Sequence, residues 1–136
     1  MIKAQLREFM EKALDDKMIS QDDVAHLLRS VLENGISCRE EAEAVVALDG
    51  AVASDASWGE ALTQLMVDFV VWGARPTGYV TAEDARWLAS LLDARGPTDN
   101  GMRIAYAIVD EAQQVDEALL AFILRGRQHT GRVLAA

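Results

Sequence analysis

Ile19-Ser20-Gln21-Asp22-Asp23, Ile36-Ser37-Cys38-Arg39-Glu40 and Val80-Thr81-Ala82-Glu83-Asp84 share one pattern: an apolar residue precedes Ser or Thr, and an acid follows three residues later. The hydroxyl oxygen of this pattern accepts a hydrogen bond from the third helical N–H, and an acid there suits the positive end of the helix dipole. Each stretch therefore predicts a helix with Ser or Thr as its N-cap. Ser57 and Glu60 form a similar pair and predict a further helix start.

Apolar spacing and stop signals place seven helices along the chain. They are expected at about residues 2–15, from Ser20 to Asn34-Gly35, from Ser37 to Asp49-Gly50, from Ser57 to Gly73, from Thr81 to Gly96-Pro97, and at about 99–113 and 116–125. No segment alternates polar and apolar residues as a half-buried strand does. The sequence therefore predicts an all-α fold, a single bundle of about seven short helices.

The last helix and the residues after it differ in composition. The helix is expected to pack through Leu119, Leu120, Phe122 and Ile123. Residues 126–136 hold three basic or imidazole side chains and two glycines, with no regular apolar stripe. We therefore expect an all-helical domain over residues 1–125 and a flexible basic tail over residues 126–136.

A shift of 61 positions, the separation of Ser20 from Thr81, aligns several further pairs without a gap. These pairs are Asp23 with Asp84, Leu27 with Leu88, Gly35 with Gly96, Ser37 with Thr98, Ala44 with Ala105, Asp49 with Asp110 and Asp55 with Asp116. One explanation is an internal duplication that makes two related three-helix halves, followed by a C-terminal helix. The other is that alanine-rich helices share the same start and stop signals without common ancestry.

Charge and composition narrow the classes of partner. Thirteen Lys and Arg against 22 Asp and Glu give a net charge of −9, which is opposite to what binding to nucleic acid requires. The single cysteine cannot form an internal disulfide, and the longest apolar stretch, residues 65–72, is too short to span a bilayer. We expect a cytoplasmic protein that neither binds nucleic acid nor inserts into a membrane.

Two kinds of loop in the sequence resemble calcium-binding loops. The turns around Ile19 and Val80 resemble EF-hand loops that have lost their ligands, and these two residues are expected to form a short backbone bridge with each other. The loop that starts at Asp49 keeps more acids, because Asp55 and Glu60 fall on its seventh and twelfth positions. No cofactor is expected; the alternative is a calcium or other divalent ion held by Asp49, Asp55 and Glu60.

The segment Leu48-Asp49-Gly50-Ala51-Val52, with Glu60 downstream, resembles the Asp-Gly-x-[Ile/Val] segments at helix junctions of the TerB-like family, which is associated with tellurite resistance. The resemblance covers about residues 36–112. It implies a small acidic helical domain, a stress-response setting and a metal-ligand role for Asp49. The chain departs from that family in the loop before Glu60, which is longer and poorer in acids.

Aromatic residues near one helix start suggest a surface for a partner. Trp72, Tyr79 and Trp87 lie near the start of the fifth helix, and rigid amphipathic side chains are common anchors of interfaces. The alternative is packing at the edge of the core. The catalytic motifs of hydrolases, metalloproteases and phosphate-binding enzymes do not occur.

The sequence therefore favours a non-enzymatic interaction or scaffold domain with a protein partner, which includes a second copy of the chain. One alternative function is a metal-responsive TerB-like protein, and a second is an unrecognised enzyme.

Overall fold

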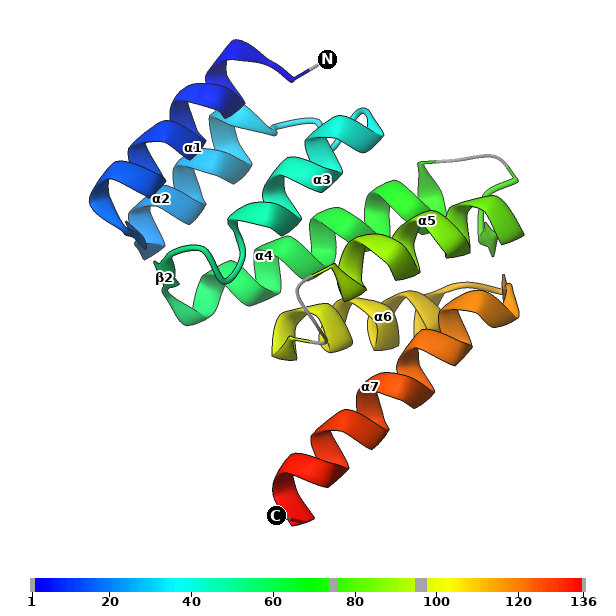
Figure 1. The fold of residues 1–136 in the computed structure, drawn as a ribbon. Coiled ribbons are helices and arrows are strands. Elements are labelled where there is room, and N and C mark those ends of the chain that lie inside the picture. The colour runs from blue at the N-terminus through cyan, green and yellow to red at the C-terminus, as the bar shows by residue number, and fades with distance from the viewer. Residues whose placement is uncertain (1, 74–75, 95–97, 136) are drawn as a thin grey trace. The chain divides into compact units, whose positions relative to one another are not determined.

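Helices cover most of residues 2–73, 76–94 and 98–135, the residues that this computed structural model describes, with side chains described as far as residue 127. Seven α-helices and four two-residue strands are present in this part of the chain (Figure 1). The all-α fold class predicted from the sequence is confirmed. The chain divides into two compact units, residues 1–69 and 70–136.

The N-terminal unit joins four helices through one small parallel strand pair. Its elements are α1 (Ala4–Asp16), β1 (Met18–Ile19), α2 (Gln21–His26) with its π-helical continuation η1 (Leu27–Val31), α3 (Arg39–Leu48), β2 (Ala53–Ser54) and α4 (Ala56–Val67). Met18 lies opposite Ala53, so the loop after α1 is tied to the loop after α3. α1 packs against η1 and α2 packs against α4 (Figure 1). The largest fully buried side chains include Leu6, Ile19, Leu27, Leu48, Trp58, Leu62 and Met66.

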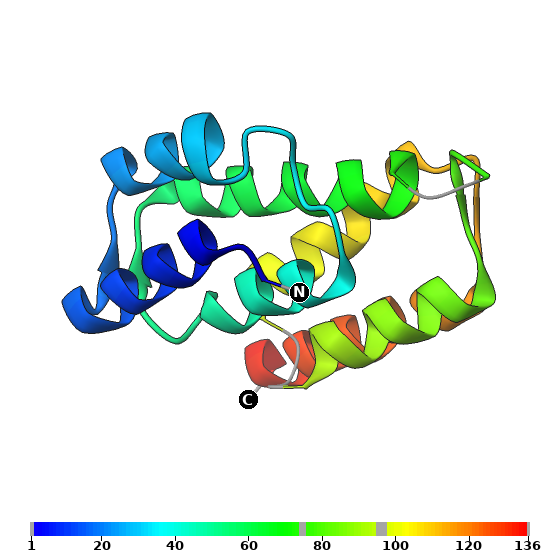
Figure 2. The same ribbon diagram turned by 90° about the horizontal axis from the view of Figure 1, so that it is seen from above.

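The described part of the C-terminal unit has three α-helices and its own strand pair. Its elements are η2 (Asp68–Trp72), which follows α4 directly and starts before the boundary, β3 (Tyr79–Val80), α5 (Ala82–Asp93), α6 (Asp99–Glu111), β4 (Gln114–Val115) and α7 (Glu117–Ala135). Tyr79 lies opposite Gln114. Figure 2 shows α5 alongside α7, which is the most extensive helix contact of this unit. Leu88, Ile104, Ile108, Leu119 and Phe122 form the buried centre.

The shift of 61 positions places β1 on β3 and β2 on β4 without adjustment. The backbone hydrogen bonds repeat as well. Asp55 N donates to Ile19 O at 2.9 Å, and the equivalent Asp116 N donates to Val80 O at 3.0 Å. Shared helix signals alone do not require such a match between strand pairs, so the structure favours internal duplication.

The expected backbone bridge between Ile19 and Val80 is wrong. Each residue pairs inside its own unit, Ile19 with Ser54 and Val80 with Val115. The reason is that each unit contains a second loop, after α3 or α6, that supplies a closer strand partner.

Two of the predicted N-caps are confirmed. Ser20 Oγ accepts from Asp23 N at 3.1 Å, while Ser20 N donates to Asp23 Oδ2 at 3.0 Å, which completes a capping box. Thr81 Oγ1 accepts from Asp84 N at 3.3 Å.

Two predicted N-caps are wrong. Cys38 is the N-cap of α3, and Ser37 instead donates its N–H (2.8 Å) and its hydroxyl (2.7 Å) to Oε1 of the buried Glu41. Asp55, rather than Ser57, is the N-cap of α4. Because the strand pair holds the Asp55 N–H on Ile19, the chain can enter a helix immediately after this residue.

The predicted end of the last helix at residue 125 is also wrong. α7 continues to Ala135, so most of the segment expected as a tail is helical. Gly126, which marked the end of the apolar pattern, lies buried within this helix. Glycine lowers the helix propensity by about 1 kcal/mol relative to alanine, but the helix continues through this residue. The expected stop at Gly96-Pro97 lies outside the described residues.

Candidate functional site

The three predicted metal ligands have separate structural environments. Asp49 follows α3, and its Oδ1 accepts a hydrogen bond from Trp58 Nε1 at 3.0 Å. Asp55 Oδ1 accepts from Ser57 N at 2.9 Å, and this backbone hydrogen bond lowers the pKa of Asp55. Glu60 lies exposed on α4. In residues 2–73, 76–94 and 98–135, no three His, Cys, Asp or Glu side chains are grouped as a metal site.

The predicted partner residues lie in the C-terminal unit, at different depths. Trp72 and Tyr79 are 46% and 42% exposed, whereas Trp87 is half-buried on α5. Trp72 packs beside Gly78, because a Cβ atom added to Gly78 would lie 3.7 Å from the indole ring. Trp72 and Tyr79 are therefore both accessible beside the same turn, whereas Trp87 is turned further into the unit.

Two shallow depressions of the C-terminal unit share Asp116, and Tyr79 lines one of them. The first, of about 260 Å³, is lined by Pro76, Tyr79, Val80, Thr81, Ala82, Gln114 and Asp116. The second, of about 460 Å³, is lined by Arg86, Asp116, Glu117, Ala118, Leu120, Ala121 and Leu124. Asp116 lines both, so they are neighbours. We call Tyr79, Leu120 and Leu124 the apolar face of the C-terminal unit.

Leu120 and Leu124 were not recognised as surface residues in the sequence. Leu120 was expected to point inward, but it is 41% exposed, and Leu124 is 59% exposed. Leu119, Phe122 and Ile123 already fill the inner stripe of α7. The sequence does contain a sign of this second surface, because Leu120 and Leu124 are four residues apart and form a second apolar stripe on the same helix.

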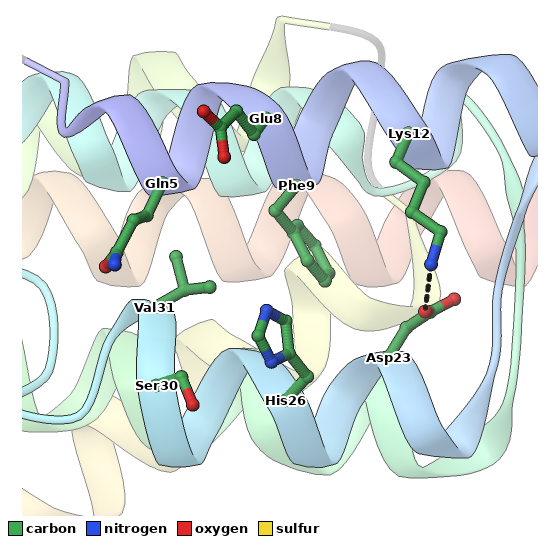
Figure 3. Close-up of a pocket in the computed structure, with 8 residues that line it drawn as sticks. All are labelled: Gln5, Glu8, Phe9, Lys12, Asp23, His26, Ser30 and Val31. Carbon is green, nitrogen blue, oxygen red and sulfur yellow. Dashed lines mark ion pairs between the residues drawn. The ribbon is translucent and has the colours of Figure 1, made fainter.

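A further pocket lies in the N-terminal unit, between α1 and α2 with its continuation η1. It has a volume of about 340 Å³ and is lined by Gln5, Glu8, Phe9 and Lys12 of α1 and by Asp23, His26, Ser30 and Val31 of α2 and η1 (Figure 3). We call it the α1–α2 groove. Phe9 and Val31 are buried and form an apolar floor below charged and polar side chains. Lys12 Nζ lies 3.9 Å from Asp23 Oδ1.

Charge is distributed unequally between the two units. Residues 1–69 contain six Lys and Arg against fourteen Asp and Glu, a formal charge of −8. Residues 70–136 contain seven against eight, a charge of −1, and the two sum to the net −9 of the chain. The α1–α2 groove therefore belongs to the strongly acidic unit, and the apolar face to the nearly neutral one.

Comparison with models of protein families, with curated proteins and with solved structures found no match to this chain. The TerB-like resemblance of residues 36–112 therefore stays a prediction. No helix in the described part of the chain has the length and apolar character needed to cross a membrane.

Proposed function

We propose that this chain is a non-enzymatic interaction domain that binds a protein partner through the apolar face of its C-terminal unit. The observation that carries the proposal is the exposure of Leu120 and Leu124 around one depression, which shares Asp116 with the depression that Tyr79 lines. Large apolar side chains gathered on one surface are typical of binding sites.

The composition of this surface suits an interface. Its apolar centre is bordered by the charged groups of Arg86, Asp116 and Glu117. An apolar centre with a polar rim is the usual anatomy of protein interfaces, in which aromatic anchors contribute much of the affinity. Full burial of one leucine side chain is worth about 1.5–3 kcal/mol, so two leucines can supply a substantial part of a binding free energy.

A cytoplasmic location and a second copy of the chain as partner are parts of this proposal. The stress-response setting depends on the TerB-like resemblance alone. The predicted metal-responsive alternative gains no support from the environments of Asp49, Asp55 and Glu60, which are not grouped in the described structure.

Site-specific photocrosslinking in cells tests the proposal. A benzophenone amino acid is placed at Leu124, with Ser90, which is exposed on α5 of the same unit, as the matched control. We expect an adduct of higher mass from Leu124 and none from Ser90. The same reaction on purified protein identifies a second copy, because a dimer then forms without other components. No adduct at Leu124, or only a crosslink within one chain, would contradict the proposal.

A further inference from the structure

We infer that the α1–α2 groove of the N-terminal unit is a second binding site, which takes a basic segment of a partner protein by accepting an Arg or Lys side chain at the Asp23 carboxylate, with Glu8 lining the α1 side of the groove. This inference is independent of the apolar face, because every lining residue lies in the other unit. Its support comes from the geometry of one carboxylate, from the lining of the groove and from the charge of the unit.

A hydrogen bond to one of its two oxygens fixes the orientation of the Asp23 carboxylate. Oδ2 accepts the N–H of Ser20 at 3.0 Å within the capping box, so the orientation of the group is set by the helix start. Oδ1 faces Lys12 at 3.9 Å, which is longer than the 2.7–2.9 Å or so of a charge-assisted hydrogen bond. Oδ1 can therefore accept a shorter hydrogen bond from an incoming cation.

The other residues that line the groove are also suited to bind an Arg or Lys side chain. The Glu8 side chain makes no hydrogen bond or ion pair with any residue in the described part of the chain, and Glu8 lies one turn before Lys12 on α1. Figure 3 shows the His26 ring directed toward α1, beside Phe9. An Arg or Lys side chain can lay its methylene groups on the Phe9 and Val31 floor while its charged end meets the Asp23 carboxylate. Lys12 already places an ammonium at this position and acts as an internal competitor.

The charge of the unit favours a segment with several basic residues over a single small cation. A net charge of −8 on 69 residues attracts a polycation over a distance, whereas a small amine gains only from the nearest carboxylates. The groove is also open along two helices, which leaves room for the chain that carries the inserted side chain.

Fluorescence anisotropy with a labelled peptide of alternating Arg and Ala tests the inference, with a Glu and Ala peptide as the negative probe. Glu8→Gln is compared with Glu11→Gln, which removes the same charge from α1 outside the groove lining. We expect Glu8→Gln to weaken binding by up to about fivefold more than Glu11→Gln, the value of one exposed ion pair. Lys12→Gln should tighten binding more than Arg7→Gln, because it removes the competitor and not only a positive charge.

The outcomes separate the explanations. Equal effects of the two glutamate substitutions, in variants whose thermal unfolding is unchanged, would show general attraction to an acidic surface and would overturn the inference. Competition by arginine amide as effective as that of the unlabelled peptide would overturn the choice of a protein segment. Amide shifts in a nitrogen–proton correlation spectrum should concentrate on α1, α2 and η1. A Leu124→Glu variant should bind the peptide as the parent chain does, so that failure of this site and failure of the apolar face are distinguished.

Discussion

Asp55 and Asp116 occupy equivalent places in the two units. Each follows a two-residue strand, donates its N–H to the facing strand and accepts a hydrogen bond from the N–H two residues later. The sequence pointed to Asp55 as a metal ligand because an acid at that spacing occurs in calcium loops. The structure gives its carboxylate a different task, which is to begin α4.

The role of Asp55 predicts a pH dependence. The hydrogen bond from the Ser57 N–H lowers the pKa of Asp55 in the folded chain, so its stabilising contribution is fully present above the ordinary aspartate pKa. The contribution is lost as the pH falls through the lowered folded-state pKa. In urea unfolding, the stability difference between the parent chain and Asp55→Ala should therefore shrink as the pH is lowered below about 4. A difference that does not change with pH would contradict this role.

Asp49 is predicted to stabilise the fold through Trp58. Trp58 is fully buried, and its indole N–H donates to Asp49 Oδ1. Asp49→Ala leaves this donor without that acceptor and should cost about 1–3 kcal/mol in chemical unfolding. Glu60→Ala, which changes an exposed acid on α4, is the control and should have little effect. Calcium that stabilises the parent chain but not Asp49→Ala would restore the metal-ligand hypothesis.

At the scale of elements, a helix start depends both on its own residues and on what precedes it. The Ser20 and Thr81 caps use a hydroxyl and a nearby N–H within one short segment, and the sequence predicted them correctly. The starts of α3 and α4 were misplaced because Glu41 and β2 supply interactions that the capping pattern does not include.

Ser20→Ala and Thr81→Ala should each destabilise the chain by about 1 kcal/mol, the usual value of a helix N-cap. Ser54→Ala is the matched control, since Ser54 is exposed and its side chain makes no hydrogen bond in the described structure. Thermal or urea unfolding of the three variants is the measurement. A loss for Ser54→Ala as large as for the other two would mean that general effects of serine removal dominate.

The turns before β1 and β3 predict opposite effects on stability when the residues Lys17 and Gly78 are exchanged in type. Lys17 and Gly78 are related by the shift of 61, and both have left-handed backbones, with φ of 59° and 85°. A residue with a Cβ atom is strained in this region, whereas glycine is not. Lys17→Gly should therefore stabilise the chain by up to about 1 kcal/mol, and Gly78→Lys should destabilise it. Equal losses in both variants, measured by thermal unfolding, would contradict the equivalence of the two turns.

At the scale of the whole molecule, the repeat preserved the backbone plan while the charge of the two units diverged. Both units contain a parallel strand pair at equivalent positions. The net charge is −8 in one unit and −1 in the other. Different surfaces on a shared plan are consistent with two units that bind different partners, which the peptide and crosslinking experiments address separately.

Truncation of α7 tests whether the end of this helix contributes to the stability of the C-terminal unit. We expect deletion of residues 127–136 to leave the melting temperature nearly unchanged, because this segment has no regular apolar stripe that would join the core. Circular dichroism should nevertheless lose helical signal, since α7 extends to Ala135. Deletion from residue 119 is the control and should unfold the C-terminal unit, because Leu119 and Phe122 are fully buried. A large loss of stability in the shorter deletion would show that the end of α7 is docked.

The sequence by itself determined the all-α fold class, the caps at Ser20 and Thr81 and the 61-residue spacing of equivalent signals, because these depend on residues close together in the chain or on a regular period. Only the tertiary structure decided that Ile19 pairs with Ser54, that Asp55 begins α4 and that Leu120 faces outward. It also created the α1–α2 groove, by bringing Glu8 and Asp23 to the same cavity. These features depend on which segments meet in space, and a local pattern of side chains does not contain that information.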